Sequence, residues 1–236
     1  MGSMDVYKFD IDRDELGRRL GGGLAKGSIT LIEGPDGSGK SVLSQRITYG
    51  LLQNGHTVTY ISTELSTKDF INQMLSLKYN IIPFLLNRQL LFVPVFPPSV
   101  RKLKRKKDLV RRMMNAPYLF EREVTIIDSF TLMLDGGRLD KNTLFQFINF
   151  MKKIISQGKS IILTVDPRST AIEVLEPLRD VADNYVITRS EIMADDIKNV
   201  LLVRRWKRTE REVAKVIKFR VEPKFGIIID ISSFAI

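Results

Sequence analysis

The residues from Gly34 to Ser41 have the clearest capacity for chemistry in this chain. They read GPDGSGKS, a glycine, four further residues and then Gly-Lys-Ser, which is the pattern of a loop whose backbone N–H groups surround phosphates. Glycines at 34, 37 and 39 permit a tight backbone and close approach of a ligand. Lys40 would reach the β- and γ-phosphates, and the Ser41 hydroxyl would ligate Mg²⁺. A strand-like segment precedes the loop and a helix-like segment follows it, so the stretch predicts a site for ATP and Mg²⁺.

Two carboxylates are candidates for completing this site. Asp128 ends the apolar segment VTIID at the carboxyl end of a predicted strand, where open α/β sheets bind ligands; capping of the next turn is the alternative role. Ser129 follows it in place of the glutamate with which many P-loop ATPases activate water. Glu64, in TYISTELS, is therefore the candidate base, although it could instead support the turn or the next helix. The predicted nucleotide-binding residues are Gly34, Pro35, Asp36, Gly37, Ser38, Gly39, Lys40, Ser41 and Asp128, the predicted metal ligands are Ser41 and Asp128, and the predicted catalytic residue is Glu64.

These residues need a scaffold, and the hydrophobic pattern switches repeatedly between strand-like and helix-like periods. Predicted strands cover residues 28–33, 57–62, 90–96, 124–128, 160–165, 185–188, 199–205, 213–221 and 226–232. Predicted helices cover residues 40–53, a segment capped by Ser66 that runs to about 78, the basic tract 101–112, a segment that Gly158 ends, and about 170–181. The alternation predicts an α/β fold with a mostly parallel twisted sheet, helices on both faces and antiparallel strands at the C-terminal edge.

Composition excludes several kinds of site. The 236 residues contain no cysteine and one histidine, which excludes disulfides, thiolate metal sites and a histidine cluster for zinc. No apolar run approaches the roughly 18 residues that span a bilayer, and the start of the chain has no export pattern, so a cytoplasmic location is expected. The initial Met-Gly-Ser is interpreted as a vector-derived remnant, and one nucleotide-binding domain is expected over residues 4–236.

The positive charge of the chain is concentrated in two places. The net charge is +10, which points to an acidic partner such as nucleic acid, an anionic membrane surface or an acidic protein. Residues 101–112 hold eight basic side chains against one acid, and residues 204–211 form a second cluster. The first tract has three interpretations: an amphipathic helix with its basic face in water, a docking face for an acidic partner or anionic membrane, or a nucleic-acid contact.

The motifs together resemble a known family. LGGGLAKGSITLIEGPDGSGKS (20–41), the strand ending near Glu64, the IIDS segment at Asp128 and the ending KVIKFRVEPKFGIIIDIS resemble RecA-superfamily ATPases of the KaiC type, and among them the archaeal flagellar (archaellum) accessory ATPases. The resemblance covers nearly the whole chain. It implies a RecA-like P-loop fold that binds ATP and Mg²⁺, a homo-oligomeric ring, and association at the membrane periphery with the archaellum motor ATPase and membrane-associated motor proteins.

Departures from the family pattern, and one residue that a neighbour would supply, bear on the rate of ATP hydrolysis. Ala25 replaces a usual proline, a departure with little expected consequence. Leu65 follows Glu64 where KaiC-type domains commonly have two adjacent glutamates, so slow hydrolysis, or none by the isolated chain, is expected. Family members receive a basic residue from a neighbouring subunit, and the matching candidates are Arg204, Arg205, Lys207 and Arg208. Thr164 and Asp166 match a γ-phosphate-sensing position, although Asp166-Pro167 could simply form a turn.

A second function is also compatible with these motifs. A RecA/RadA-like DNA-dependent ATPase of the same superfamily is the alternative. The short connections after Asp128 and Asp166, and the absence of a separate N-terminal DNA-binding domain, argue against it.

Overall fold

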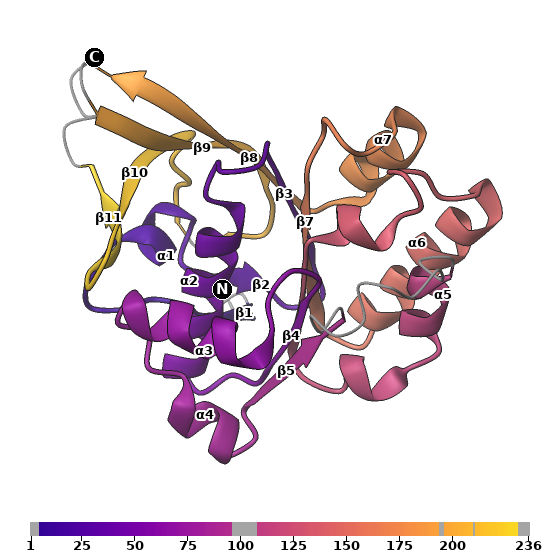
Figure 1. Ribbon diagram of the computed structural model, residues 1–236, viewed down its shortest axis with the longest axis horizontal. Coiled ribbons are helices and arrows are strands. Elements are labelled where there is room, and N and C mark those ends of the chain that lie inside the picture. The colour runs from indigo at the N-terminus through magenta and orange to yellow at the C-terminus, as the bar shows by residue number, and fades with distance from the viewer. Residues whose placement is uncertain (1–4, 96–107, 194–195, 210, 231–236) are drawn as a thin grey trace.

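A nine-stranded sheet runs through the molecule in the order β11-β10-β9-β8-β3-β7-β6-β4-β5 (Figure 1). The computed structural model describes residues 5–95, 108–193, 196–209 and 211–230. The strands are β3 (Ile29–Glu33), β4 (Val58–Ser62), β5 (Leu90–Pro94), β6 (Val124–Asp128), β7 (Ser160–Val165), β8 (Asn184–Met193), β9 (Asp196–Trp206), β10 (Val216–Glu222) and β11 (Gly226–Ile229). Neighbours from β8 to β5 are parallel, whereas β8 to β11 pair antiparallel. This arrangement confirms the predicted fold class.

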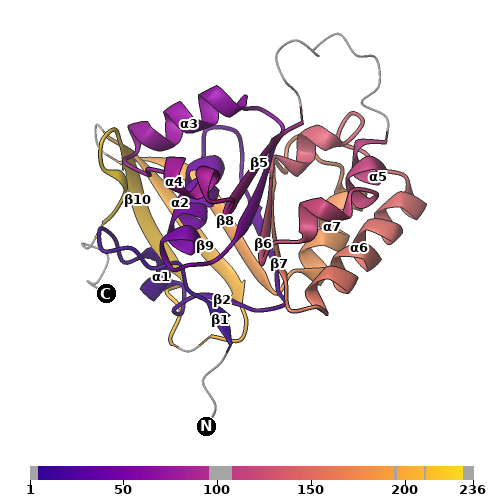
Figure 2. The same cartoon turned by 90° about the horizontal axis from the view of Figure 1, so that it is seen from below.

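Helices cover both faces of the sheet, with α1 to α4 on one side and α5 to α7 on the other (Figures 1 and 2). They are α1 (Leu16–Arg19), α2 (Lys40–Gln53), α3 (Thr67–Ser76), α4 (Ile82–Leu86), α5 (Leu109–Met114), α6 (Lys141–Ile155) and α7 (Ile172–Val181). Successive residues of a strand enter opposite cores: Ile126 packs with the α2 and α3 side chains, and Ile127 with those of α6 and α7. Burial on both faces explains why the central strands read as unbroken apolar runs.

The N-terminal segment folds against α2. It contains the short strands β1 (Val6–Tyr7) and β2 (Leu24–Ala25), which pair antiparallel outside the main sheet. The fully buried Arg46 of α2 donates from Nε and Nη2 to the Asp14 carboxylate, at 2.7 and 2.6 Å, and from Nη1 to the Phe9 carbonyl at 2.7 Å. A Cβ on Gly50 would lie 2.1 Å from the same carbonyl oxygen. These contacts hold α2, the helix that follows the phosphate loop, against the N-terminal segment.

Most predicted elements are confirmed, with differences at their ends. The predicted helix 40–53 has the same limits as α2, and the Ser66 hydroxyl caps α3 by accepting from the Asp69 amide at 3.2 Å. The predicted strands 185–188 and 199–205 are too short, because β8 and β9 continue as a paired ribbon as far as Met193 and Asp196. Pairing between two strands extends them beyond the segment that the apolar pattern marks.

The predicted helix across the basic tract is wrong at Asp108. This residue has φ of +79°, in the left-handed region, and α5 begins only after it, because an α-helix cannot continue through such a residue. The rest of this predicted helix, residues 101–107, lies outside the described residues. Within α5, Val110 and Met113 are buried while Arg112 is exposed, so this end of the tract is amphipathic.

The lengths and apolar character of the helices bear on whether any of them could span a bilayer. Across the part of the chain that the structure describes, no helix combines the length and apolar character needed to cross a membrane.

Candidate functional site

The loop from Gly34 to Gly39 connects the end of β3 to the start of α2. Gly37 and Gly39 have φ of +76° and +88°, a region that glycine adopts without strain. A Cβ on Gly34 would lie 2.2 Å from the Thr188 hydroxyl, whereas a Cβ on Gly37 would meet nothing within 4 Å. The loop is therefore packed against β8 at its start and open at its tip, where the positive end of α2 favours an anion.

Lys40 is the buried cation of this loop. Its side-chain nitrogen donates to the Pro35 carbonyl at 2.7 Å, so the lysine closes the loop that it follows. Desolvation lowers the pKa of Lys40, against the opposing effect of nearby carboxylates. These carboxylates belong to Asp166, Asp128, Asp36 and Glu64. The negative charge of these carboxylates opposes the approach of a polyphosphate, so a bound cation would favour its entry.

Asp128 and Ser41 lie together, as the prediction of a shared metal ion requires. The Ser41 hydroxyl donates to Asp128 Oδ1 at 3.2 Å, and the Thr164 hydroxyl donates to the same oxygen at 2.7 Å. The Tyr60 hydroxyl donates to Oδ2 at 2.6 Å. A serine hydroxyl beside a buried carboxylate is a hard oxygen donor set, which suits Mg²⁺. The residues therefore fit the ion that the phosphate loop implies, with the phosphates and water supplying the other ligands.

Glu64 lies two residues beyond the end of β4, in an exposed position. The preceding residue, Thr63, is tied to β6, since its amide donates to the Asp128 carbonyl at 2.8 Å and its hydroxyl to the Ser129 carbonyl at 3.1 Å. Partial desolvation raises the pKa of Glu64, and the negative charges of Asp128 and Asp36 add to this effect. The carboxylate is thus within the electrostatic field of the loop, while its role as a base stays a prediction.

Asp166 contacts the tip of the phosphate loop directly. Its Oδ2 accepts from the Asp36 amide at 3.1 Å, and its Oδ1 accepts from the Arg168 amide at 2.9 Å. The backbone amide of Asp166 donates to the Thr131 hydroxyl at 2.9 Å. Asp166 therefore shapes its own turn and also touches the loop, so both interpretations of this residue agree with its position.

Several residues around the loop carry no signal in the sequence. The hydroxyls of Thr188 and Ser38 are 2.7 Å apart, and the Ser190 hydroxyl lies 3.3 Å from the Gly37 carbonyl. Thr188 and Ser190 belong to β8; in the sequence, Thr188 ends the predicted strand 185–188 and Ser190 lies beyond it, and neither forms part of a binding motif. Only the pairing of β8 with β3 brings them to the loop.

The four basic candidates near the end of β9 differ in what they contact. Arg205 donates to the Arg179 carbonyl, and Arg208 donates to the carbonyls of Lys26 and Gly27 at 3.0 and 2.7 Å. Lys207 lies 3.7 Å from the Asp183 carboxylate. Arg204 is exposed, and within the described ranges it has neither an ion pair nor a side-chain hydrogen bond. Arg208 lies at the start of β3, at the opposite end of that strand from the phosphate loop, so it does not reach the loop of its own chain.

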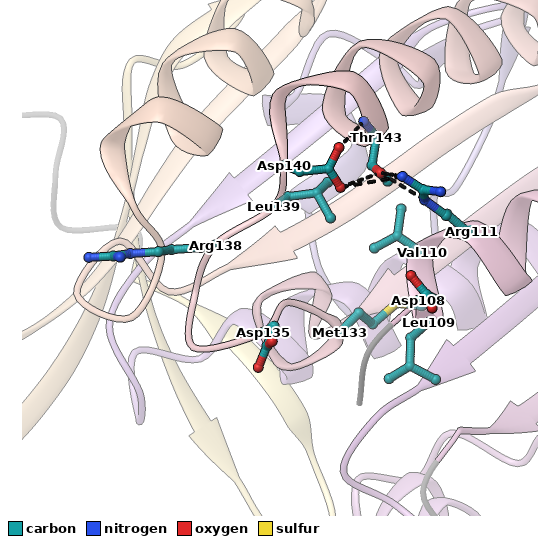
Figure 3. Close-up of a pocket in the computed structure, with 10 residues that line it drawn as sticks. All are labelled: Asp108, Leu109, Val110, Arg111, Met133, Asp135, Arg138, Leu139, Asp140 and Thr143. Atoms are coloured by element: carbon teal, nitrogen blue, oxygen red, sulfur yellow. Dashed lines mark hydrogen bonds and ion pairs between the residues drawn. The ribbon is translucent and has the colours of Figure 1, made fainter. Parts of the chain in front are cut away.

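A separate cavity of about 550 Å³ lies between α5 and the start of α6 (Figure 3). The Arg111 side chain donates to the Thr143 hydroxyl at 2.6 and 2.8 Å, and that hydroxyl donates to Asp140. These bonds, together with the Thr143 amide, lower the pKa of Asp140. None of the predicted nucleotide residues lines this cavity, which is bordered by Asp108, Leu109, Val110, Arg111, Met133, Asp135, Arg138, Leu139, Asp140 and Thr143.

A parallel sheet with a phosphate loop between β3 and α2, and an acid at the end of β6, which β7 separates from β3, defines a P-loop protein of the RecA type. The KaiC family of ATPases matches residues 12–233, so the chain belongs to the KaiC family of ATPases and is a nucleotide-binding protein. Over 235 residues and 100% of both chains, it is 38% identical to the archaeal flagellar ATP-binding protein FlaH of Methanocaldococcus jannaschii. The FlaH protein of Methanococcus voltae is 34% identical over 98% of this chain and 100% of its own length.

A solved structure agrees with this placement, whereas a more distant relative matches only part of the chain. The crystal structure of the flagellar accessory protein FlaH from Methanocaldococcus jannaschii has a TM-score of 0.89 and 36% identity, covering 97% of this chain and 100% of that one. The DNA repair protein RadA of Helicobacter pylori is 44% identical over only 62 residues, which are 26% of this chain and 14% of RadA. The similarity to RadA is therefore confined to a short segment, whereas that to FlaH spans the fold.

The raised pKa of Glu64 leads to a prediction about stability. Between the ordinary value of 4.5 and the raised pKa, the folded protein binds more protons than the unfolded chain, so stability falls as the pH rises through this window. Glu64→Gln removes the ionisation and is expected to increase the melting temperature slightly at neutral pH, by about 1 to 2 °C for a surface change, with no gain below the window. Melting curves from acidic to neutral pH measure this, with Glu212→Gln as the exposed control. A gain that persists at low pH would contradict the electrostatic origin.

Proposed function

We propose that this protein is an ATP- and Mg²⁺-binding component of the archaellum motor, which acts as a nucleotide-dependent ring or switch and hydrolyses ATP slowly or not at all alone. The observation that carries the proposal is similarity over the full length to proteins named archaeal flagellar ATP-binding protein FlaH. Residues 4–236 would act as one nucleotide-binding unit, located in the cytoplasm at the membrane-embedded motor.

The chemistry of the site supports holding nucleotide more than consuming it. Lys40 and the loop amides would bind the phosphates, and Ser41 with Asp128 would hold Mg²⁺, which supplies charge neutralisation and orients the phosphates when bound. Glu64 is the candidate base, because the chain has Leu65 and Ser129 at positions where, by the resemblance, KaiC-type domains and many P-loop ATPases commonly have glutamate. With an exposed base, the isolated chain lacks strong activation of water.

The position of the basic cluster supports completion of the site by a second copy of the chain. A cation from a neighbour can contribute roughly 10³ to 10⁵ in rate to phosphoryl transfer. Arg205 and Arg208 are occupied by backbone carbonyls of their own chain, and Lys207 lies 3.7 Å from the Asp183 carboxylate. We therefore propose that Arg204 is the residue that extends into the nucleotide site of a neighbouring subunit.

The decisive experiment measures solution mass and ATP turnover together. We expect a nucleotide-dependent increase in mass, and turnover far below the usual range of about 1 to 10³ s⁻¹ for the dilute chain. Addition of the purified archaellum motor ATPase tests the partner directly, with a shift in mass as the expected result. A chain that hydrolyses ATP at several per second without any partner would overturn the slow-switch proposal.

The alternative of a DNA-dependent ATPase has the short similarity to RadA in its favour. It predicts oligonucleotide binding that falls steeply as salt increases, since phosphate contacts release counterions, together with stimulation of turnover by DNA. Fluorescence anisotropy with a labelled oligonucleotide at several salt concentrations separates the two functions.

The basic tract 101–112 provides a prediction about the motor environment. Reversal of Arg101, Lys102, Lys104 and Arg105 to glutamate is expected to weaken binding to vesicles containing anionic lipid by a factor on the order of 10² to 10³, since each basic residue near such a surface contributes about 1 kcal/mol. The ATP-induced melting shift should remain, because these residues lie outside the phosphate loop. Vesicle sedimentation at low and high salt measures the effect. Unchanged binding with an unchanged salt dependence would leave the tract as a solvated surface.

A further inference from the structure

Tyr60 is a fully buried polar residue that is not among the predicted site residues. It lies in β4, next to β6 in the sheet, where it is paired with Ile126. Its hydroxyl donates to Asp128 Oδ2 at 2.6 Å and lies 2.9 Å from the Ser44 hydroxyl. A bond of this length to a carboxylate is typical of a strong, charge-assisted interaction.

The same hydroxyl connects both predicted metal ligands. Ser44 is on α2, one turn beyond Ser41, and its hydroxyl lies 2.9 Å from the Ser41 carbonyl as well as from Tyr60. Tyr60 therefore contacts Asp128 directly and reaches the backbone of Ser41 through a single intervening side chain. These contacts join β4, β6 and α2 at the point where the metal ion would bind.

Aromatic packing fixes the position of this hydroxyl. The Tyr60 ring lies 4.8 Å from the ring of Phe70 and 6.1 Å from that of Phe92, and these two phenylalanines stack at 4.2 Å. A ring enclosed in this way has little rotamer freedom. The location of the oxygen is thus set by the core between β4, β5 and α3, and solvent does not reach it.

Such a rigid donor determines how the carboxylate is oriented. The Ser41 and Thr164 hydroxyls share Oδ1, whereas Tyr60 is the side chain that bonds Oδ2 among the described residues. Without this donor, Asp128 would keep a buried oxygen unpaired or rotate to recover a partner, and both are unfavourable. Groups that hold a ligand in this way commonly change metal affinity by about 10- to 100-fold when removed.

We propose that Tyr60 is a positioning residue that holds Asp128, and through Ser44 the start of α2, in the arrangement that binds Mg²⁺ with the nucleotide. This inference rests on the proposed function, since it assumes that Ser41 and Asp128 hold the ion. It assigns a role in the site to a strand residue that touches neither the phosphate loop nor the predicted base.

The variant Tyr60→Phe tests this proposal because it removes the hydroxyl and keeps the ring. The quantity to measure is the concentration of Mg²⁺ that gives half of the ATP-induced increase in melting temperature. We expect it to rise about tenfold in the variant, while binding of a fluorescent ATP analogue with EDTA present stays within about twofold of wild type. A general loss of structure would weaken both measurements alike, so the difference between them identifies positioning.

Tyr79→Phe is the matched control, since it also removes a buried tyrosine hydroxyl from this core. That hydroxyl accepts from the Ile227 amide at 3.1 Å and has no contact with Asp128. We expect Tyr79→Phe to lower the melting temperature of the ligand-free protein without changing the Mg²⁺ requirement. If Tyr60→Phe does not fold, Ser44→Ala gives the second measurement, with an expected two- to fivefold rise, smaller because the carboxylate keeps its direct donor.

Failure of the proposed ATP and Mg²⁺ site and failure of the role of Tyr60 give different results. Wild-type protein with no Mg²⁺-dependent stabilisation by ATP would overturn the proposed site itself. Normal wild-type behaviour, with Tyr60→Phe or Ser44→Ala showing an unchanged Mg²⁺ requirement, would overturn only the role of Tyr60. If the role is correct, the effect of Tyr60→Phe on the Mg²⁺ requirement disappears in an Asp128→Asn background, because the two residues act through one contact.

Discussion

Lys40→Ala is expected to abolish most of the stabilisation that ATP and Mg²⁺ give to the wild-type protein. Ligand at 100 times its dissociation constant adds about 2.7 kcal/mol, which corresponds to an increase of about 5 to 10 °C in melting temperature for a chain of this size. Lys40 is the buried cation among four carboxylates, so its loss leaves the phosphates facing a negatively charged site. Thermal melting with and without Mg²⁺ and ATP measures the difference.

Lys159→Ala is the matched control for this experiment. Its side-chain nitrogen donates to the Phe120 carbonyl at 2.7 Å, as that of Lys40 does to Pro35, but it precedes β7 at the opposite end of the sheet from the loop. Both variants lose a lysine that bonds a backbone carbonyl, and only Lys40→Ala should lose the response to nucleotide. An ATP-induced shift of wild-type size in Lys40→Ala would exclude the assignment of the 34–41 loop.

The parts of the fold that the sequence predicts well are those with local signals. The helix 40–53 begins at a glycine-rich loop and ends before Asn54 and Gly55, and its predicted limits agree with α2. Strand 124–128 is a short apolar run, and burial on both faces gives it that composition. In each case the residues that determine the element lie within it or next to it.

The contacts that depend on tertiary structure could not be predicted in this way. Glu33 ends an apolar strand directly before the phosphate loop, and its buried carboxylate accepts from Arg179 at 2.6 and 2.8 Å and from Tyr185 at 2.8 Å. These partners are 146 and 152 positions away in the chain. Tyr60 and Thr188 are similar cases, because their sequence context marks only a strand. Asp14 and Arg46 form a buried pair that no spacing rule connects.

Substitution of Arg204 is expected to have the largest effect on the rate of ATP hydrolysis. If Arg204 completes the site of a neighbour, turnover per chain should rise with protein concentration as chains assemble. Arg204→Ala is then expected to remove this concentration-dependent part, by about 10³-fold or more, while the melting shift with ATP and Mg²⁺ remains. Steady-state turnover over a range of protein concentrations measures it. Arg220→Ala, which removes another exposed arginine whose ion pair within the described residues is with Glu222, is the control and should leave turnover unchanged.

Mixing two inactive variants tests whether the residue acts between chains. Lys40→Ala cannot bind nucleotide but still carries Arg204, and Arg204→Ala binds nucleotide but lacks the cation. Where an Arg204→Ala chain receives the arginine of a Lys40→Ala neighbour, an intact composite site forms, so the mixture should regain part of the wild-type turnover that neither variant has alone. Recovery requires a contribution from a second chain, because no single chain in the mixture contains both groups. A mixture as inactive as its components, or Arg204→Ala with full turnover, would mean that Arg204 does not act on the site of a neighbour.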